Sequence, residues 1–134
     1  WEKVLALGPD SIDPDALADA QPANEQIEKW AIEDWGADVA AEVIAQWKQK
    51  SRPRDVLRAE ITSFRDRLPQ IREAVSKDLL PSTTVANAIR ESGGPTAPEG
   101  MNAPIEEYHN ALLRARYIRN RFTILDLAAE LGAL

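Results

Sequence analysis

Four arginines lie close together in the last part of the chain, at positions 114, 116, 119 and 121. No acidic residue occurs between Glu107 and Asp126, so this segment is positively charged throughout. A guanidinium group presents five N–H donors in a rigid plane, and this geometry matches the oxygens of a phosphate or a carboxylate. Arginines also occur near helix C-termini because they meet the negative end of the helix dipole there.

Among these arginines, Arg119 stands out by its spacing. A helix is expected over about residues 104–119, with a buried face at Ile105, Tyr108, Leu112 and Ala115. Arg119 is the next step of four residues, so in a continuous helix its guanidinium must be paired or face a polar cavity. Alternatively, the helix frays at Asn120, and Arg119 then bonds to carbonyl groups or to an internal carboxylate such as Asp126.

The sequence offers no catalytic group or metal-ligand set beside these arginines. His109 is the only histidine, and one histidine forms neither a catalytic triad nor a metal cage. Glu106 and Glu107 are adjacent, so they point to different sides of a helix and do not make a carboxylate pair. Nucleotide-binding loops, nucleophile elbows and zinc-protease motifs are missing as well. We therefore assign no catalytic residue and no metal ligand to this chain.

Composition describes a single acidic domain. The 134 residues include 16 basic and 22 acidic side chains, which give a net charge of -6. This balance argues against nucleic acid or an anionic membrane as the main partner. The absence of cysteine excludes disulfides and thiolate metal sites and fits a cytoplasmic protein. No apolar run approaches the roughly 20 residues of a membrane span, and no signal-peptide pattern is visible.

Apolar spacing and capping residues predict an all-α fold, because no segment alternates with the period of a strand. Asp13 and Pro14 open a short helix that runs to about residue 20. Two helices follow, one from about Pro22 to Gly36 and one over about residues 37–50. Later helices are expected at about 81–92, at 104–119 and from Thr123 onward, where Asp126 completes a capping box. Residues 93–104, which are rich in glycine and proline, form a loop.

The longest predicted helix covers about residues 53–80. Its apolar stripe is spaced by four, three, four, three and four residues, at Leu57, Ile61, Phe64, Leu68, Ile71 and Val75. Such a stripe must pack on other helices, within the chain or in a coiled coil with a partner, and the uneven charge pattern favours the former. Pro69 should kink this helix because it lacks an N–H and crowds the preceding turn.

Three tryptophans follow the apolar faces of the preceding helices, at positions 30, 35 and 47. We interpret them as packing residues. The alternative is that one of them stacks on a ligand.

The first residues of the chain read as a helix entered midway. Residues 1–7 are largely apolar and have no N-cap, whereas Gly8 and Pro9 supply a complete stop signal. We therefore expect the chain to be a single helical domain, residues 1–134, excised from a longer protein. Its apolar surface near Trp1, Val4 and Leu5 should then be exposed or covered by self-association.

The carboxyl-terminal block, about residues 80–134, carries two segments that match a known family. Residues 94–99 read GPTAPE, and residues 117–127 read YIRNRFTILDL. This block resembles the end of the glycerol-1-phosphate dehydrogenase branch of the iron-containing alcohol dehydrogenase superfamily. There, a Gly-Ala-Pro-Thr loop precedes a helix that ends in a Tyr-Ile-Arg-x-Arg-Tyr/Phe-Thr-x-Leu-Asp-Leu motif. This chain departs from that pattern at Gly94, where alanine is usual, and at residues 100–102, where a longer turn is expected.

The resemblance implies the carboxyl-terminal half of the helical domain of a dehydroquinate synthase-like enzyme. Such an enzyme reduces dihydroxyacetone phosphate to glycerol 1-phosphate, with NAD(P) and a divalent metal such as Zn, Fe or Ni. Its nucleotide-binding domain and metal ligands would precede Trp1, so this part alone is expected to bind neither cofactor nor metal and to be inactive. Arg119 and Arg121 lie in the matched motif and are the candidates for holding the substrate phosphate. The alternative is a helical interaction domain without catalysis.

Overall fold

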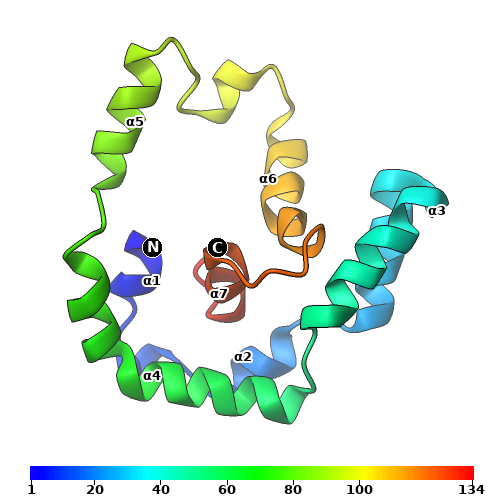
Figure 1. Cartoon of the computed structure of the whole chain (residues 1–134), viewed down its shortest axis with the longest axis horizontal. Helices are drawn as coiled ribbons and strands as arrows, with labels where there is room; N and C mark the ends of the chain where they lie inside the picture. Colours follow the sequence, from blue (N-terminus) through cyan, green and yellow to red (C-terminus); the bar gives the residue numbers. More distant parts are fainter.

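The computed structural model describes all 134 residues, and each regular element in it is a helix. The α-helices are α1 (Glu2–Ala6), α2 (Pro14–Ala20), α3 (Asn24–Lys50), α4 (Arg54–Ser76), α5 (Ser82–Glu91), α6 (Ile105–Arg114) and α7 (Ile124–Glu130). Short 3-10 turns are η1 (Pro9–Ser11), η2 (Pro98–Met101) and η3 (Ala115–Tyr117). The prediction of an all-α fold is confirmed (Figure 1). No helix is both long and apolar enough to cross a membrane.

The structure has the predicted helix boundaries where a capping side chain or a glycine sets them. Asp13 Oδ1 accepts hydrogen bonds from the N–H groups of Asp15 and Ala16, at 3.0 and 3.1 Å, and so caps α2. Asp126 Oδ2 accepts from the N–H and the hydroxyl of Thr123, at 2.7 and 2.9 Å, at the start of α7. The capping box predicted there is confirmed.

Helix α3 is a hairpin of two helical arms that meet at Gly36 (Figure 1). Gly36 has φ +74°, a left-handed conformation that breaks the helix where the sequence predicts its end. The arms are joined across the hairpin by a 3.0 Å hydrogen bond from Trp47 Nε1 to Asn24 Oδ1. Trp30, Trp35 and Trp47 all pack around the buried residues of this hairpin and Tyr117, which confirms their packing role.

Helix α4 provides the floor of the main core. Leu57, Ile61 and Leu68 from the predicted stripe are buried, and Phe64 packs against them. Pro69 lies inside the helix, which bends along its course (Figure 1). The helix ends at Ser76 rather than near residue 80, because Pro81 disfavours helical geometry in the residue before it.

The main core brings together the two ends of the chain. Its buried residues come from α1, η1, α2, α4, α7 and their flanks: Val4, Ile12, Ala18, Leu57, Ile61, Leu68, Ala128 and Leu131. The expectation of exposed apolar residues in α1 is therefore wrong for Val4, which packs on α7 and α4. It holds for Trp1, which is exposed, while Leu5 is half-buried.

Helices α5 and α6 form an arch that contributes no buried residue (Figure 1). Ile89 on α5 and Ile105 on α6 are both exposed, so the buried face predicted for residues 105–115 is wrong for Ile105 and for the exposed Ala115. The chain exposes 8669 Å² of surface. A compact monomer of 14.9 kDa exposes about 7,000 Å². The fold is therefore unusually open.

Candidate functional site

The structure separates the four clustered arginines. Helix α6 ends at Arg114 and passes into η3, so the face that was expected to lead to Arg119 stops before reaching it. Arg119 and Arg121 are exposed. The arginine on the inside is Arg116, which is 5% exposed. Asp126 is the internal carboxylate considered as the partner of Arg119, and it pairs with Lys50 instead.

Lys50 fastens the end of α3 to the segment before α7. Its Nζ donates to Asp126 Oδ1 at 2.8 Å and to the carbonyl of Arg121 at 3.2 Å, and also to the carbonyl of Arg116. The Lys50 and Asp126 side chains are only 6% and 2% exposed. All three donors of this ammonium group are therefore used for holding the chain together.

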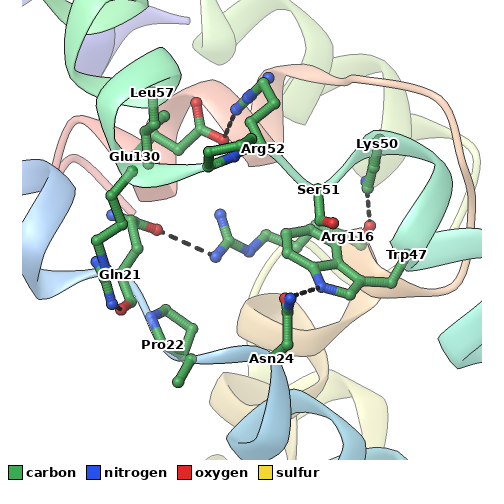
Figure 2. Close-up of a pocket in the computed structure, with 13 residues that line it drawn as sticks. Gln21, Pro22, Asn24, Trp47, Lys50, Ser51, Arg52, Leu57, Arg116 and Glu130 are labelled. Carbon is green, nitrogen blue, oxygen red and sulfur yellow. Dashed lines mark hydrogen bonds and ion pairs between the residues drawn. The ribbon is translucent and has the colours of Figure 1, made fainter.

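Arg116 points into a pocket of about 250 Å³ between α2, α3, α4 and α7. Figure 2 shows its guanidinium in the middle of this pocket, between Gln21 on one side and Trp47 and Ser51 on the other. Nη2 donates to Gln21 Oε1 at 3.3 Å and to the hydroxyl of Tyr117 at 2.9 Å. Nε and Nη1 are buried and have no protein acceptor.

The other basic side chains of the pocket are engaged with protein groups. Arg54 donates to the carbonyls of Ala18 and Gln21, the latter at 2.7 Å. Arg52 pairs with Glu130 and with Glu60. Arg52 Nε also lacks a hydrogen-bond acceptor, but it lies 3.0 Å from the Glu60 carboxylate. Arg116 is thus the guanidinium of the pocket with two unpaired nitrogens and no carboxylate partner.

Glu130 is the single acidic residue that lines the pocket. Its burial raises the pKa of the carboxyl group above the ordinary value, and the nearby charges of Arg52 and Arg116 only partly oppose this. The ion pair with Arg52 therefore does not offset the desolvation of the carboxylate. Protonation of Glu130 leaves the pocket more positive.

The residues of the chain do not form a site for a metal ion or a nucleotide. No cluster of three or more His, Cys, Asp or Glu side chains exists in it. Its sheet-free fold also lacks the strand and glycine-rich turn on which dinucleotides usually bind. The residues present therefore do not fit a resident metal or NAD(P), and no chemical step through either group follows from this chain.

Comparison with known protein families, with curated proteins and with solved structures found no match.

The expectation that Arg119 continues the buried face of an unbroken helix is wrong, because α6 ends before it and a 3-10 turn at residues 115–117 follows. The substrate-binding role of Arg119 and Arg121 stays a prediction. The adjacent Tyr117 is buried against Trp30 and Trp47. Its hydroxyl and its ring both contact the Arg116 guanidinium, which is therefore held inside the protein. In the sequence, only the neighbouring tyrosine indicates that Arg116 is buried, and an aromatic residue next to an arginine is a weak indication.

Proposed function

We propose that this chain is the carboxyl-terminal helical part of an NAD(P)-dependent and metal-dependent polyol-phosphate dehydrogenase of the glycerol-1-phosphate type. The observation that carries the proposal is the segment YIRNRFTILDL at residues 117–127, which resembles the end of those enzymes. The proposed activity of the complete enzyme is the reduction of dihydroxyacetone phosphate to glycerol 1-phosphate, for which other parts of that enzyme would hold NAD(P) and the metal. The finer assignment to a dehydroquinate synthase-like fold belongs to the same proposal.

The role of the motif in the fold supports this reading. Tyr117 lies in the core of the α3 hairpin, and Asp126 caps α7 while pairing with Lys50. The motif thus joins α7 to α3, which is a reason for a helical domain to need these residue types at this spacing. Arg119 and Arg121 remain exposed between these two anchors and would be available to the phosphate of a substrate held against this surface.

The openness of the arch also supports the proposal. Helices α5 and α6 contain no fully buried residue, and an apolar pocket of about 480 Å³ opens beside Trp1, Leu80 and Leu112. An amphipathic helix is stabilised mainly by burying its apolar face. A nucleotide-binding domain would cover such surface in the complete enzyme and supply the cofactor site, and the metal ligands would come from the part of the helical domain that precedes Trp1.

The test is to express the complete reading frame that contains this segment and to measure NADH and NADPH oxidation with dihydroxyacetone phosphate. We expect activity that a chelator removes and that a divalent metal restores, with the 134-residue chain inactive as a control. Arg119→Lys keeps the charge but loses the planar fork, so it should lower kcat/KM by about tenfold or more at unchanged melting temperature. A full-length product without reductase activity on this substrate would contradict the proposal.

A helical interaction domain without catalysis is the second candidate. The exposed apolar residues of the arch favour it, among them Leu80, Val85, Ile89, Met101 and Leu113. A surface of this kind marks a contact with another protein or with a second copy of the chain. A reading frame that encodes no nucleotide-binding domain, together with concentration-dependent association in sedimentation, would favour this candidate over the dehydrogenase.

A further inference from the structure

We infer that the Arg116 pocket is a binding site for a phosphate oxyanion, either inorganic phosphate or the phosphoryl group of a monoester. The inference rests on this chain alone and does not depend on the dehydrogenase proposal. It concerns a side chain that differs from the exposed Arg119 and Arg121.

The first observation is the unpaired guanidinium. Arg116 is 5% exposed, and its Nε and Nη1 are buried without an acceptor. A buried charged donor that lacks a partner is costly. The two contacts of Nη2 and the Tyr117 ring, whose centroid lies 4.8 Å from the Arg116 guanidinium carbon, hold the group in one place. The guanidinium that lines the pocket is thus held by a fixed scaffold and has donors without an acceptor.

The second observation is the charge of the pocket wall. Four basic side chains and one acid, Glu130, line it, the basic ones being Lys50, Arg52, Arg54 and Arg116. Lys50 and Arg52 are paired with carboxylates, whereas Arg54 and Arg116 form no ion pair. This concentration is local, because the whole chain carries a net charge of -6. A multiply charged oxyanion gains more from such a field than a monocarboxylate does.

The third observation is that two helices begin at the pocket. Ala23 and Asn24 at the start of α3 line it, as do Pro53 and Arg54 at the start of α4. Neither helix has a side-chain cap, and the first N–H groups of a helix have no intrahelical partner and favour an anion. The carboxyl end of α3 also reaches the pocket, and Lys48 and Lys50 in its last turn offset its negative pole.

Occupancy can be read at Arg116 itself. The Nε–H resonances of the arginines are followed by ¹⁵N NMR while inorganic phosphate is added to the 134-residue chain, with sodium chloride at equal ionic strength as the reference. We expect a saturable shift of the Arg116 signal with phosphate, a smaller response to acetate, and none with chloride. Glycerol phosphate in a parallel titration distinguishes an ester-linked phosphoryl group from the free ion. Equal responses to phosphate and chloride would overturn the inference.

Variants separate the site from general electrostatics. Arg116→Lys should weaken phosphate binding about tenfold, because an ammonium group cannot supply the planar donors. Arg90→Lys, the matched change at an exposed arginine of α5 that does not line the pocket, should leave binding unchanged. Glu130→Gln removes the competing carboxylate and should tighten binding several-fold, so the inference stays testable if Arg116→Lys does not fold. Weaker or unchanged binding in Glu130→Gln would count against it.

Discussion

The body of the molecule and its arch are built from helices of similar amphipathic pattern, yet they are held together differently. In the body, α1, α2, α4 and α7 share one buried core, and Lys50 adds a buried ion pair with Asp126. In the arch, α5 and α6 bury no residue. The difference shows that apolar spacing alone specifies a face, whereas burial depends on which other element the chain brings to that face.

The attachment of the arch illustrates the contrast. The Glu2 carboxylate in α1 accepts hydrogen bonds from the N–H and the hydroxyl of Ser82, at 2.6 and 2.7 Å. This contact caps α5 from outside its own sequence, and it lowers the pKa of Glu2. The α5 end of the arch is thus tied to the body by an exposed polar contact. At the α6 end, Arg114 pairs with Asp34 of α3 and lies over Trp30.

The largest effect should come from Lys50→Met. It leaves the Asp126 carboxylate buried without its cation, which should lower the free energy of unfolding by about 3 to 5 kcal/mol. Lys48→Met is the matched control, because Lys48 forms an exposed pair with Glu28 and its loss should cost less than about 1 kcal/mol. Urea unfolding followed by circular dichroism measures both. Equal losses would show that the buried pair does not stabilise the body.

The second-largest difference between body and arch should appear in the unfolding free energy when an apolar side chain is truncated. Leu68→Ala opens a cavity at a side chain that is fully buried in the main core and should cost about 2 to 5 kcal/mol. Ile89→Ala removes an exposed side chain from the arch and should change the unfolding free energy by no more than about 0.5 kcal/mol. A large loss for Ile89→Ala in urea unfolding would mean that the arch has a core of its own or with a second copy.

The pH dependence of the body should follow Glu130. Because burial raises its pKa above the ordinary 4.5, the folded state binds this proton more tightly than the unfolded state does. Its contribution to stability is therefore complete below pH 4.5 and falls as pH rises through the raised pKa. Glu130→Gln should raise the urea midpoint near neutral pH and flatten this part of the profile. The exposed Glu107→Gln serves as the control and should leave the profile unchanged.

The smallest effect should appear at the junction of the two regions. Glu2→Gln weakens the cap on α5, so amide hydrogen exchange in residues 82–91 should become faster while exchange in α4 stays the same. Acid should act in the same direction, because a carboxyl with a lowered pKa loses its stabilising contact as pH falls through that pKa. Unchanged exchange in α5 would show that other contacts hold the arch.

Most helices of the fold could be predicted from local features of the sequence. Asp13, Gly36 and Thr123 act on their immediate neighbours, so the helix boundaries they set could be predicted. The stripe of α4 could be predicted for the same reason, since a helix of 23 residues shows its period plainly. The burial of Val4 depended on tertiary contacts instead, because α7 packs against α1 in the main core.

The site was harder to predict because it is assembled from distant residues. Gln21, Lys50, Arg116 and Glu130 come from four separate segments, and no spacing along the chain relates them. The decisive detail was the change from α6 to the 3-10 turn η3, which moved the inward position from Arg119 to Arg116. A shift of this kind depends on the packing of Tyr117 against the α3 hairpin, which the sequence pattern does not encode.

The packing of α1 against α7 bears on how the protein is made. Val4 and Ala128 share the main core, although they lie at opposite ends of the sequence. During synthesis, α1 leaves the ribosome well before α7 has been made. Val4 and Leu68 therefore lack the part of their apolar core that α7 supplies until then. Helices α2 and α4 can pair early, but the core closes only after the last turn of α7 has left the exit tunnel.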